Sequence, residues 1–331
     1  MKINTDTINK ILIIQYQPFG DVLLNTGYFH ALRKKFKTAK IDFLVREPYH
    51  VVLNENPYLD EVIVFKNGKG FSYVAERIKL IKDINSRKYD LIIDQIRNTG
   101  SAQITYFSGA KYRLGFDHQR WRFVYNIKAK RGKIRYHSSM KFDALKPLGI
   151  KEEKHNLYYK INEDSKEYIS SWLNEKKLST VKIVCFSPGS PVKAKKWSLQ
   201  GYAQLGDLIS KELNCKIVLL WGPGEKKDVE EVNQLMLEEG IIAPPTSFNQ
   251  AAVMLQKSSL LVCNDGGLNH LSVAAEVPSI AIFGKHKPTR WSPVIFDGHY
   301  HFYDEKADHK NDSTLGISVE DVFNKVKEIL K

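Results

Sequence analysis

The chain has 331 residues, more than one ordinary hydrophobic core organises and enough for two domains. Hydrophobic residues make up 43% and charged residues 26%, a globular composition that excludes an intrinsically disordered chain. The net charge of +13 favours an anionic partner, which composition leaves open as nucleic acid, an acidic membrane surface or a phosphorylated substrate. A lysine-rich genome would produce the same surplus without functional meaning.

In the N-terminal half, short apolar runs alternate with segments in which apolar residues recur at helical spacing. The apolar runs predict buried strands over residues 10–16, 40–46, 61–65 and 89–96. The helical spacing predicts helices over residues 21–36 and 73–86. This alternation is typical of a mostly parallel sheet with helices on both faces.

The same alternation begins again in the C-terminal half. Strands that run into loops are predicted over residues 182–190, 216–225, 260–267 and 279–284. Helices are predicted between them and over residues 319–330, where the spacing is amphipathic. We therefore predict an α/β protein of two Rossmann-like domains, residues 1–170 and 171–331.

The cysteines and the N-terminus bear on the cellular compartment. Cys185, Cys215 and Cys263 lie in or beside apolar runs without C-x-x-C spacing, which predicts reduced core thiols rather than a metal site or disulfides. The polar N-terminus MKINTDTINK shows no signal peptide, and no apolar stretch approaches the roughly 20 residues that span a bilayer. We expect a cytoplasmic protein that touches a membrane only from the side.

Distinctive loops follow the predicted strands, at the strand ends where open α/β sheets bind ligands. In the C-terminal half these loops read SPGS, WGPGE, NDGG and FGKHKPTRW. Their glycines let backbone N–H groups approach a ligand, and the helix that follows favours negative charge at its start. The sequence therefore predicts an anionic ligand at this edge of the second sheet.

Asp21 follows the first predicted strand, in the segment FGDVLL, at or near the start of a helix. An aspartate there serves well as an N-cap, which needs no further function. A carboxylate that faces a cleft within hydrogen-bond reach of a hydroxyl could instead act as a general base. The residues alone leave both interpretations open.

The SPGS loop is a candidate site for a pyrophosphate. Ser187, Gly189 and Ser190 offer hydroxyls and backbone amides, and Lys195 and Lys196 follow closely. Such a loop can position phosphate oxygens while a lysine neutralises charge on a leaving group. A solvated turn with surface lysines is the alternative.

Two further strand ends carry acidic residues. Glu225 could accept hydrogen bonds from both hydroxyls of a ribose, or it could be an ordinary acid in the first turn of a helix. Asp265 could hold sugar hydroxyls, while the amides of residues 266–268 would point at an anion. His270 could donate to a phosphate or be a core histidine. The absence of G-x-G-x-x-G and of a Walker lysine disfavours a dinucleotide oxidoreductase and a P-loop NTPase.

The stretch from residue 111 to residue 135 holds nine Lys/Arg and one acid, interleaved with aromatic residues. The candidates for contact with an anionic acceptor are Lys111, Arg113, Arg120 and Arg122. Cations and aromatic rings suit an anionic glycolipid and equally a nucleic acid. A solvated basic edge without a partner is the third interpretation.

Taken in order, four motifs resemble glycosyltransferase family 9, the heptosyltransferases of lipopolysaccharide core assembly, over nearly the whole chain. They appear here as GDVLLNTGYFHALRKKFKTAKIDFLV, PGSPVKAKKW, GPGE and DGGLNHLSVAAEVPSIAIFG. The resemblance implies the GT-B fold, in which two Rossmann-like domains face a central cleft and the C-terminal helix crosses back to the N-terminal domain.

The resemblance also implies an activity and a place in the cell. The activity is inverting, metal-independent transfer of heptose or a related sugar from an ADP-sugar to the lipid A-core, without a cofactor. The enzyme would work at the inner face of the cytoplasmic membrane, in peripheral contact with it and without a specific nucleic acid partner.

Roles follow for residues that match the family motifs. Asp21 would be the general base that deprotonates the acceptor hydroxyl. The donor would be held by Ser187, Gly189, Ser190, Lys195 or Lys196 at the diphosphate, Glu225 at the ribose, Asp265 at the sugar, and the amides of Gly266, Gly267 and Leu268 at the phosphates, with His270 supporting that loop.

Three positions depart from the family pattern. Gly27 stands where a proline is common, Gly266 replaces a serine or threonine, and residues 285–286 read Lys-His in place of Pro-Thr. The last two changes leave the donor sugar open, so another nucleotide sugar is an alternative to ADP-heptose. A non-catalytic nucleic-acid-binding protein is the alternative from another class, while QPFGD lacks the glycine-rich loop of nucleotide-sugar epimerases.

Overall fold

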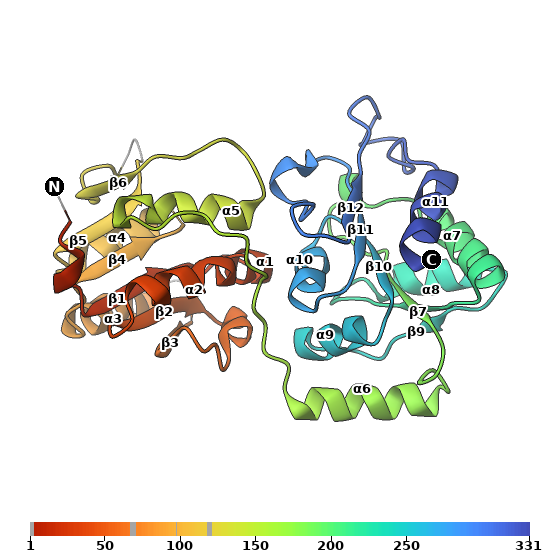
Figure 1. The fold of residues 1–331 in the computed structure, drawn as a ribbon, viewed down its shortest axis with the longest axis horizontal. Helices are drawn as coiled ribbons and strands as arrows, with labels where there is room; N and C mark the ends of the chain where they lie inside the picture. The colour runs from red at the N-terminus through yellow and green to blue at the C-terminus, as the bar shows by residue number, and fades with distance from the viewer. Residues whose placement is uncertain (1–2, 67–70, 97, 118–120) are drawn as a thin grey trace. The chain divides into compact units, whose positions relative to one another are not determined.

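The computed structural model describes residues 3–66, 71–96, 98–117 and 121–331. The chain divides into two compact units, Met1–Lys160 and Ile161–Lys331. Each unit is an α/β structure around a six-stranded sheet whose neighbouring strands are all parallel (Figure 1). The boundary predicted near residue 170 falls inside helix α6 (Glu163–Glu175), which belongs to the second unit.

The first unit has the strand order β3-β2-β1-β4-β5-β6. Its strands are β1 (Lys10–Ile14), β2 (Lys40–Arg46), β3 (Glu61–Phe65), β4 (Leu91–Asp94), β5 (Tyr112–Phe116) and β6 (Ile127–Ala129). Its helices are α1 (Phe19–Leu23), α2 (Thr26–Lys35), α3 (Phe71–Ser86), α4 (Thr99–Phe107) and α5 (His137–Lys141), with the 3-10 helices η1 (Thr5–Thr7), η2 (Tyr49–Leu53) and η3 (Phe142–Leu148).

Both faces of this sheet are buried, as the continuous apolar runs predicted. On one face Leu12 and Ile14 of β1 pack with Leu80 of α3 and Ile104 of α4. Elsewhere in the unit Phe29 of α2 packs edge-on against a ring of β2, with 5.6 Å between the ring centroids. Apolar burial on two sides is what holds a parallel sheet in place.

The single helix predicted over residues 21–36 is interrupted between α1 and α2. Asn25 donates through Nδ2 to the carbonyl oxygen of Asp21 at 2.6 Å, and Thr26 donates through Oγ1 to that of Leu23 at 2.7 Å. Such side-chain bonds compete with the helical backbone pattern. The chain therefore ends one short helix and begins another, which fixes Asp21 in the short one.

The second unit has the strand order β12-β11-β10-β7-β8-β9. Its strands are β7 (Ile183–Ser187), β8 (Lys216–Leu219), β9 (Ile241–Ile242), β10 (Leu260–Asn264), β11 (Ser279–Ile282) and β12 (His299–Phe302). Its helices are α6, α7 (Leu199–Leu213), α8 (Lys226–Leu235), α9 (Phe248–Gln256), α10 (Gly267–Ala274) and α11 (Val319–Leu330), with the 3-10 helices η4 (Lys193–Lys195) and η5 (Pro288–Arg290).

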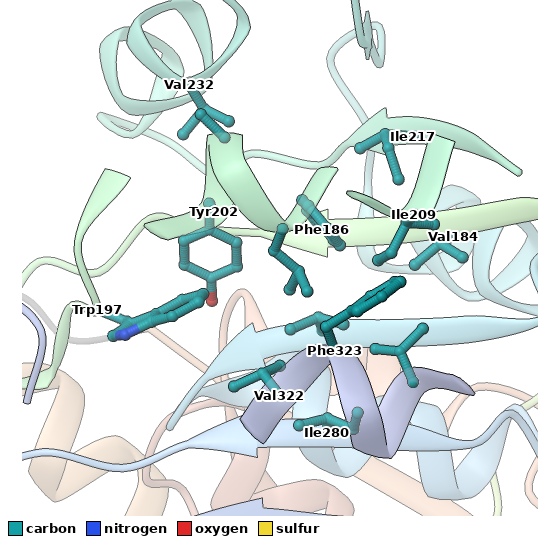
Figure 2. Packing of buried hydrophobic residues seen from close by; sticks show 14 of the residues in the cluster. Val184, Phe186, Trp197, Tyr202, Ile209, Ile217, Val232, Ile280, Val322 and Phe323 are labelled. Carbon is teal, nitrogen blue, oxygen red and sulfur yellow. The ribbon is translucent and has the colours of Figure 1, made fainter. Parts of the chain in front are cut away.

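Helix α11 contributes one face to the core of the second unit (Figure 2). Its residues Val322, Phe323 and Val326 are buried in the cluster that also holds Tyr202 and Ile209 of α7, and α11 packs against α7. The bounds of the helix were predicted correctly, and the helix belongs to the second unit.

The cysteines and the helix lengths agree with the sequence. Cys185, Cys215 and Cys263 are free and buried, as predicted. Within the described ranges, no helix is both long and apolar enough to cross a bilayer.

The strand order places one switch point in each sheet. In the first unit β2 and β3 lie on one side of β1, and β4, β5 and β6 lie on the other side, so the switch point is between β1 and β4. In the second unit the switch point is between β7 and β10. Loops at the carboxyl ends of such a pair diverge and leave room for a ligand. Asp21 follows β1, the SPGS loop follows β7, and the NDGG segment straddles the end of β10.

Candidate functional site

Asp21 lies in the first turn of α1, directly after the strand at the switch point of the first unit. Its side chain is 21% exposed. Burial raises the pKa of the carboxyl, and the ammonium group of Lys141 opposes that rise. A carboxylate with a raised pKa and an accessible edge suits a general base, because its basicity is higher than that of an ordinary aspartate.

Helix α5 brings two basic side chains to Asp21. His137 Nδ1 lies 3.8 Å from Asp21 Oδ1, and Lys141 follows one helical turn later, on the same face of the helix. Lys141 is only 4% exposed, and burial lowers the pKa of its ammonium to about 8 although Asp21 acts against that fall. Neither residue was predicted from the sequence.

A glycine permits this approach of α5. A Cβ atom on Gly27 of α2 would lie 2.3 Å from Ser138 Oγ, closer than two such atoms can come. Ser138 Oγ itself donates to the carbonyl oxygen of Leu24 at 2.9 Å. The departure at Gly27 therefore has a structural consequence, since it lets α5 pack on α2 and holds His137 beside Asp21.

A second aspartate at this switch point is committed to the fold. Asp94, at the end of β4, is buried, and its Oδ2 accepts from the hydroxyl of Tyr125 at 2.5 Å. Its Oδ1 accepts from the backbone N–H of Ile96 at 2.9 Å. These bonds satisfy both carboxylate oxygens, which leaves Asp21 as the better candidate for a base.

In the second unit, Asn264 joins the two loops at the switch point. Its buried side chain donates through Nδ2 to the carbonyl oxygen of Pro188 at 2.8 Å and accepts through Oδ1 from the backbone N–H of Trp197 at 3.0 Å. One amide thus fixes both ends of the segment that carries the predicted phosphate-binding residues. The prediction missed Asn264, although an amide at the end of an apolar strand was a visible signal.

Glu225 lies against the SPGS loop. Its Oε2 accepts from the backbone N–H of Gly222 at 2.9 Å, which closes the WGPGE turn. A Cβ atom on Gly189 would lie 2.5 Å from Glu225 Cδ, so the glycine makes room for the carboxylate. The structure therefore brings together the residues predicted for the diphosphate and for the ribose.

Lys195 and Asp265 form an ion pair between the same two loops. Lys195 Nζ lies 2.7 Å from Asp265 Oδ2, and His286 Nδ1 lies 3.6 Å from the same oxygen. The backbone N–H of Lys285 donates to the carbonyl oxygen of Ala194 at 2.8 Å, which ties the loop after β11 to this cluster. One of the departures from the family pattern thus adds a histidine beside the predicted sugar-binding carboxylate.

Lys196 points elsewhere. Its Nζ donates to Asp228 Oδ1 on α8 at 2.8 Å. Of the two lysines considered for the diphosphate, Lys195 is the one that lies with Asp265.

The serines of the SPGS loop differ in exposure. Ser187 is buried at the end of β7. Ser190 closes a tight turn, in which its Oγ donates to the carbonyl oxygen of Val192 at 3.2 Å and accepts from the N–H of that residue at 3.3 Å.

Helix α10 begins directly after Asp265, with Gly266 as its N-cap and Gly267 and Leu268 in its first turn. Gly266 has no side chain that could accept hydrogen bonds from the N–H groups at the start of α10, so no side-chain cap forms there. The positive end of the helix dipole and these donors favour an anion. His270 is buried, and burial lowers its pKa to about 4, so it is neutral at physiological pH.

Two of the cations predicted for an acceptor, Lys111 and Arg113, lie at the start of β5, away from the strand ends that carry Asp21. The guanidinium of Arg113 is hydrogen-bonded within the fold. Its Nε donates to the carbonyl oxygen of Val124 at 2.8 Å, and its Nη1 donates to that of Ala110 at 3.0 Å. Lys111 directly precedes β5, so it lies at the amino ends of the parallel strands, whereas Asp21 lies beyond their carboxyl ends. Arg122 is exposed, and Arg120 lies outside the described residues.

Comparisons with known proteins give the family of the chain. The family model of Glycosyltransferase family 9 (heptosyltransferase) matches residues 77–309. Lipopolysaccharide heptosyltransferase 2 of Escherichia coli K12 is 23% identical over 308 residues, which cover 86% of this chain and 85% of that protein.

Two solved structures share the fold. The glycosyl transferase family 9 from Veillonella parvula superposes with a TM-score of 0.88 at 23% identity and covers 97% of both chains. Escherichia coli heptosyltransferase WaaC with ADP-2-deoxy-2-fluoro heptose superposes with a TM-score of 0.73 at 19% identity and covers 96% of this chain and 99% of that one. These likenesses confirm the predicted GT-B class of two Rossmann-like units, and the family match over most of the chain means that this protein belongs to glycosyltransferase family 9, the heptosyltransferase family, and is a glycosyltransferase.

Proposed function

We propose that the enzyme transfers heptose from ADP-heptose to a lipopolysaccharide core acceptor, with inversion at the anomeric carbon and without a metal ion. The observation that carries the proposal is the cluster of Lys195, Asp265 and Glu225 at the switch point of the second unit, with Asp21 at that of the first. The curated relative is named for lipopolysaccharide heptose transfer, and a solved relative holds an ADP-heptose analogue.

The donor would bind along the carboxyl ends of β7, β8 and β10. Glu225 would accept from the ribose hydroxyls, and the N–H groups at the start of α10 would bind the diphosphate together with Ser190 and Lys195. The ion pair of Lys195 with Asp265 would open as the donor enters, so that the ammonium moves onto the diphosphate and the carboxylate is released for sugar hydroxyls.

The positive groups of the second unit would replace a cation at the leaving group. As the bond between the anomeric carbon and the diphosphate oxygen breaks, negative charge develops on that oxygen. Lys195 and the dipole of α10 stabilise this charge, which is the work that a divalent ion does in other transferases.

Asp21 would activate the acceptor. Its carboxylate takes the proton of the acceptor hydroxyl while the oxygen attacks the anomeric carbon, and ADP leaves from the opposite side, which inverts the configuration. Burial raises the pKa of Asp21 and so its basicity, while the ammonium of Lys141 opposes that rise. Attack by the deprotonated hydroxyl requires no covalent intermediate.

A different nucleotide sugar is the second candidate donor. His286 lies 3.6 Å from Asp265, and Gly266 offers no hydroxyl next to that carboxylate. Both changes alter the hydrogen-bonding groups that would face the sugar. The acceptor in either case is an anionic glycolipid at the inner face of the cytoplasmic membrane, where a protein with net charge +13 would bind peripherally.

A binding series by calorimetry in the presence of EDTA tests the donor. ADP is expected to bind more tightly than GDP, UDP or CDP, and ADP-heptose more tightly than ADP. A preference for another nucleotide would keep the mechanism and replace the sugar donor. Absence of binding to all of them would contradict the proposed function.

A further inference from the structure

We infer that an exposed apolar face of the first unit docks on the anionic surface of a lipid bilayer. This face, called here the α3–α4 face, consists of Val74 and Ile78 of α3, Tyr106 and Phe107 of α4, and Phe123 of the loop that follows β5. That this contact serves a lipid-borne acceptor rests on the proposed function. The docking itself does not depend on it.

The two helices of the α3–α4 face lie side by side and are joined at their ends. They pack against each other, and Asn85 Nδ2 of α3 donates to the carbonyl oxygen of Phe107 at 3.0 Å. Their inner residues, among them Ile84 and Ile104, fill the core of the unit. The outer residues are a separate apolar set, since Ile78 is 50% and Phe107 is 54% exposed.

The loop after β5 adds its aromatic rings to the same face. Phe123 is 62% exposed, and its ring lies 5.9 Å from that of Tyr106 and 5.7 Å from that of Trp121. Trp121 Nε1 donates to Thr99 Oγ1 at the start of α4 at 3.1 Å, which anchors the loop to the helix. Exposed rings of helix and loop therefore form one cluster, rather than scattered single residues.

The chemistry of the face fits a membrane interface. Tyrosine and tryptophan rings are favoured where an apolar body meets polar headgroups, and aliphatic side chains such as Val74 and Ile78 enter the acyl boundary. Helix α4 carries no charged residue, while Lys79, Lys82 and Arg122 on the neighbouring segments are exposed. These cations complement anionic lipids, as does the net charge of +13.

A nucleic acid fits this face less well. Aliphatic side chains neither stack on bases nor pair with phosphates, and the cations flank the rings rather than forming a track along them. The structure thus divides the basic aromatic stretch found in the sequence into an inner part, such as Arg113, and an outer part at residues 121–123 that joins the α3–α4 face.

Cosedimentation of the full-length chain with vesicles tests the inference without donor or acceptor. Vesicles of phosphatidylcholine mixed with phosphatidylglycerol are expected to bind the wild type, more weakly as salt is added, and vesicles of phosphatidylcholine alone to bind it weakly. The double variant Phe107→Ser, Phe123→Ser is expected to lower the partition coefficient about tenfold or more, because two apolar side chains no longer enter the interface.

The matched control is Leu237→Ser, which replaces a 90% exposed leucine of the second unit and is expected to leave vesicle binding unchanged. Thermal melting checks that both variants are folded, and Ile78→Ser repeats the test on the other helix. Failure of the wild type to bind anionic vesicles, equal binding by the double variant, or an equal loss in the control would each overturn the inference. If the double variant lost binding to random-sequence DNA but kept its binding to vesicles, the face would be assigned to nucleic acid and the inference would be overturned too.

The proposed transfer reaction is measured separately, with a lipid-free core oligosaccharide. The double variant is expected to turn over this acceptor at the wild-type rate. A wild type that binds vesicles but transfers no heptose would leave the docking in place and reject the proposed function.

Discussion

The Nζ atom of Lys195 lies 2.7 Å from Asp265 Oδ2, so the two loops at the switch point of the second unit are joined by an ion pair. The neighbouring Lys196 is turned to Asp228 on α8. Two adjacent lysines of the same segment thus have different surroundings, and this difference leads to the first prediction.

Lys195→Ala is expected to weaken binding of the ADP-sugar by about 1–3 kcal/mol, because a charge-assisted bond to the diphosphate is lost. Turnover should fall as well, since the same ammonium stabilises the leaving group. Lys196→Ala serves as the matched control and should change donor affinity little. Calorimetry and steady-state kinetics check both, and an equal effect of the two substitutions would remove the distinction.

Lys141→Met is expected to shift the acidic limb of the kcat/KM profile to higher pH. The ammonium of Lys141 lowers the pKa of Asp21, against the rise that burial causes, so its removal lets that pKa rise further. The carboxylate then becomes protonated at a higher pH and activity is lost earlier on acidification. An unshifted acidic limb, measured with saturating donor, would show that Lys141 does not act on the base.

Gly27→Ala is expected to lower turnover, and Gly189→Ala is expected to weaken donor binding. A Cβ at position 27 meets Ser138 Oγ at 2.3 Å, so α5 must move and His137 with it, which should lower turnover and leave donor affinity intact. The fold should lose about 1–3 kcal/mol, as overpacked sites do.

A Cβ at position 189 would lie 2.5 Å from Cδ and 2.7 Å from Cβ of Glu225, so that side chain must move, which should weaken donor binding and leave turnover of bound donor less affected. Isothermal binding, turnover and urea unfolding of the two variants distinguish the patterns. The same loss of donor affinity in both variants would count against separate roles.

The free energy of unfolding is expected to fall as the pH drops from about 6.5 towards 4. Burial lowers the pKa of His270 and of His299 to about 4, so between that value and their ordinary 6.5 the unfolded chain binds more protons than the folded one. Each histidine accounts for about 3 kcal/mol of that loss. Its contribution to the free energy of unfolding is fully present above the ordinary pKa of 6.5.

Urea unfolding at several pH values checks this, with His299→Gln as the variant. The substitution should flatten the acid dependence while leaving part of it to His270. An acid dependence as steep as that of the wild type would contradict the assignment to His299.

Much of the fold followed from the sequence because it depends on local pattern. The apolar runs located the first strands in both halves, and the amphipathic spacing gave α11 its observed bounds. The break between α1 and α2 was missed, because it depends on where the side chains of Asn25 and Thr26 bond. The packing of α11 on α7 was missed because an apolar stripe does not say which element covers it.

Some residues of the candidate site could also be predicted from local sequence pattern, and others could not. Asp21, Glu225 and Asp265 could be predicted as candidates since each follows a strand, where the topology gathers polar residues. His137 and Lys141 were not found, because their approach depends on the space at Gly27, more than a hundred positions away along the chain. The basic stretch could not be divided into its structural and exposed cations until the bonds of Arg113 were known.

The most direct test of the account is transfer from ADP-heptose to a core acceptor in the presence of EDTA, by the wild type and by Asp21→Asn. The wild type is expected to add one heptose with inverted configuration. Asp21→Asn is expected to bind the donor normally but to transfer about 10²–10⁴-fold more slowly, the usual contribution of a general base. Transfer by Asp21→Asn at the wild-type rate, or loss of its donor binding, would contradict the role given to Asp21.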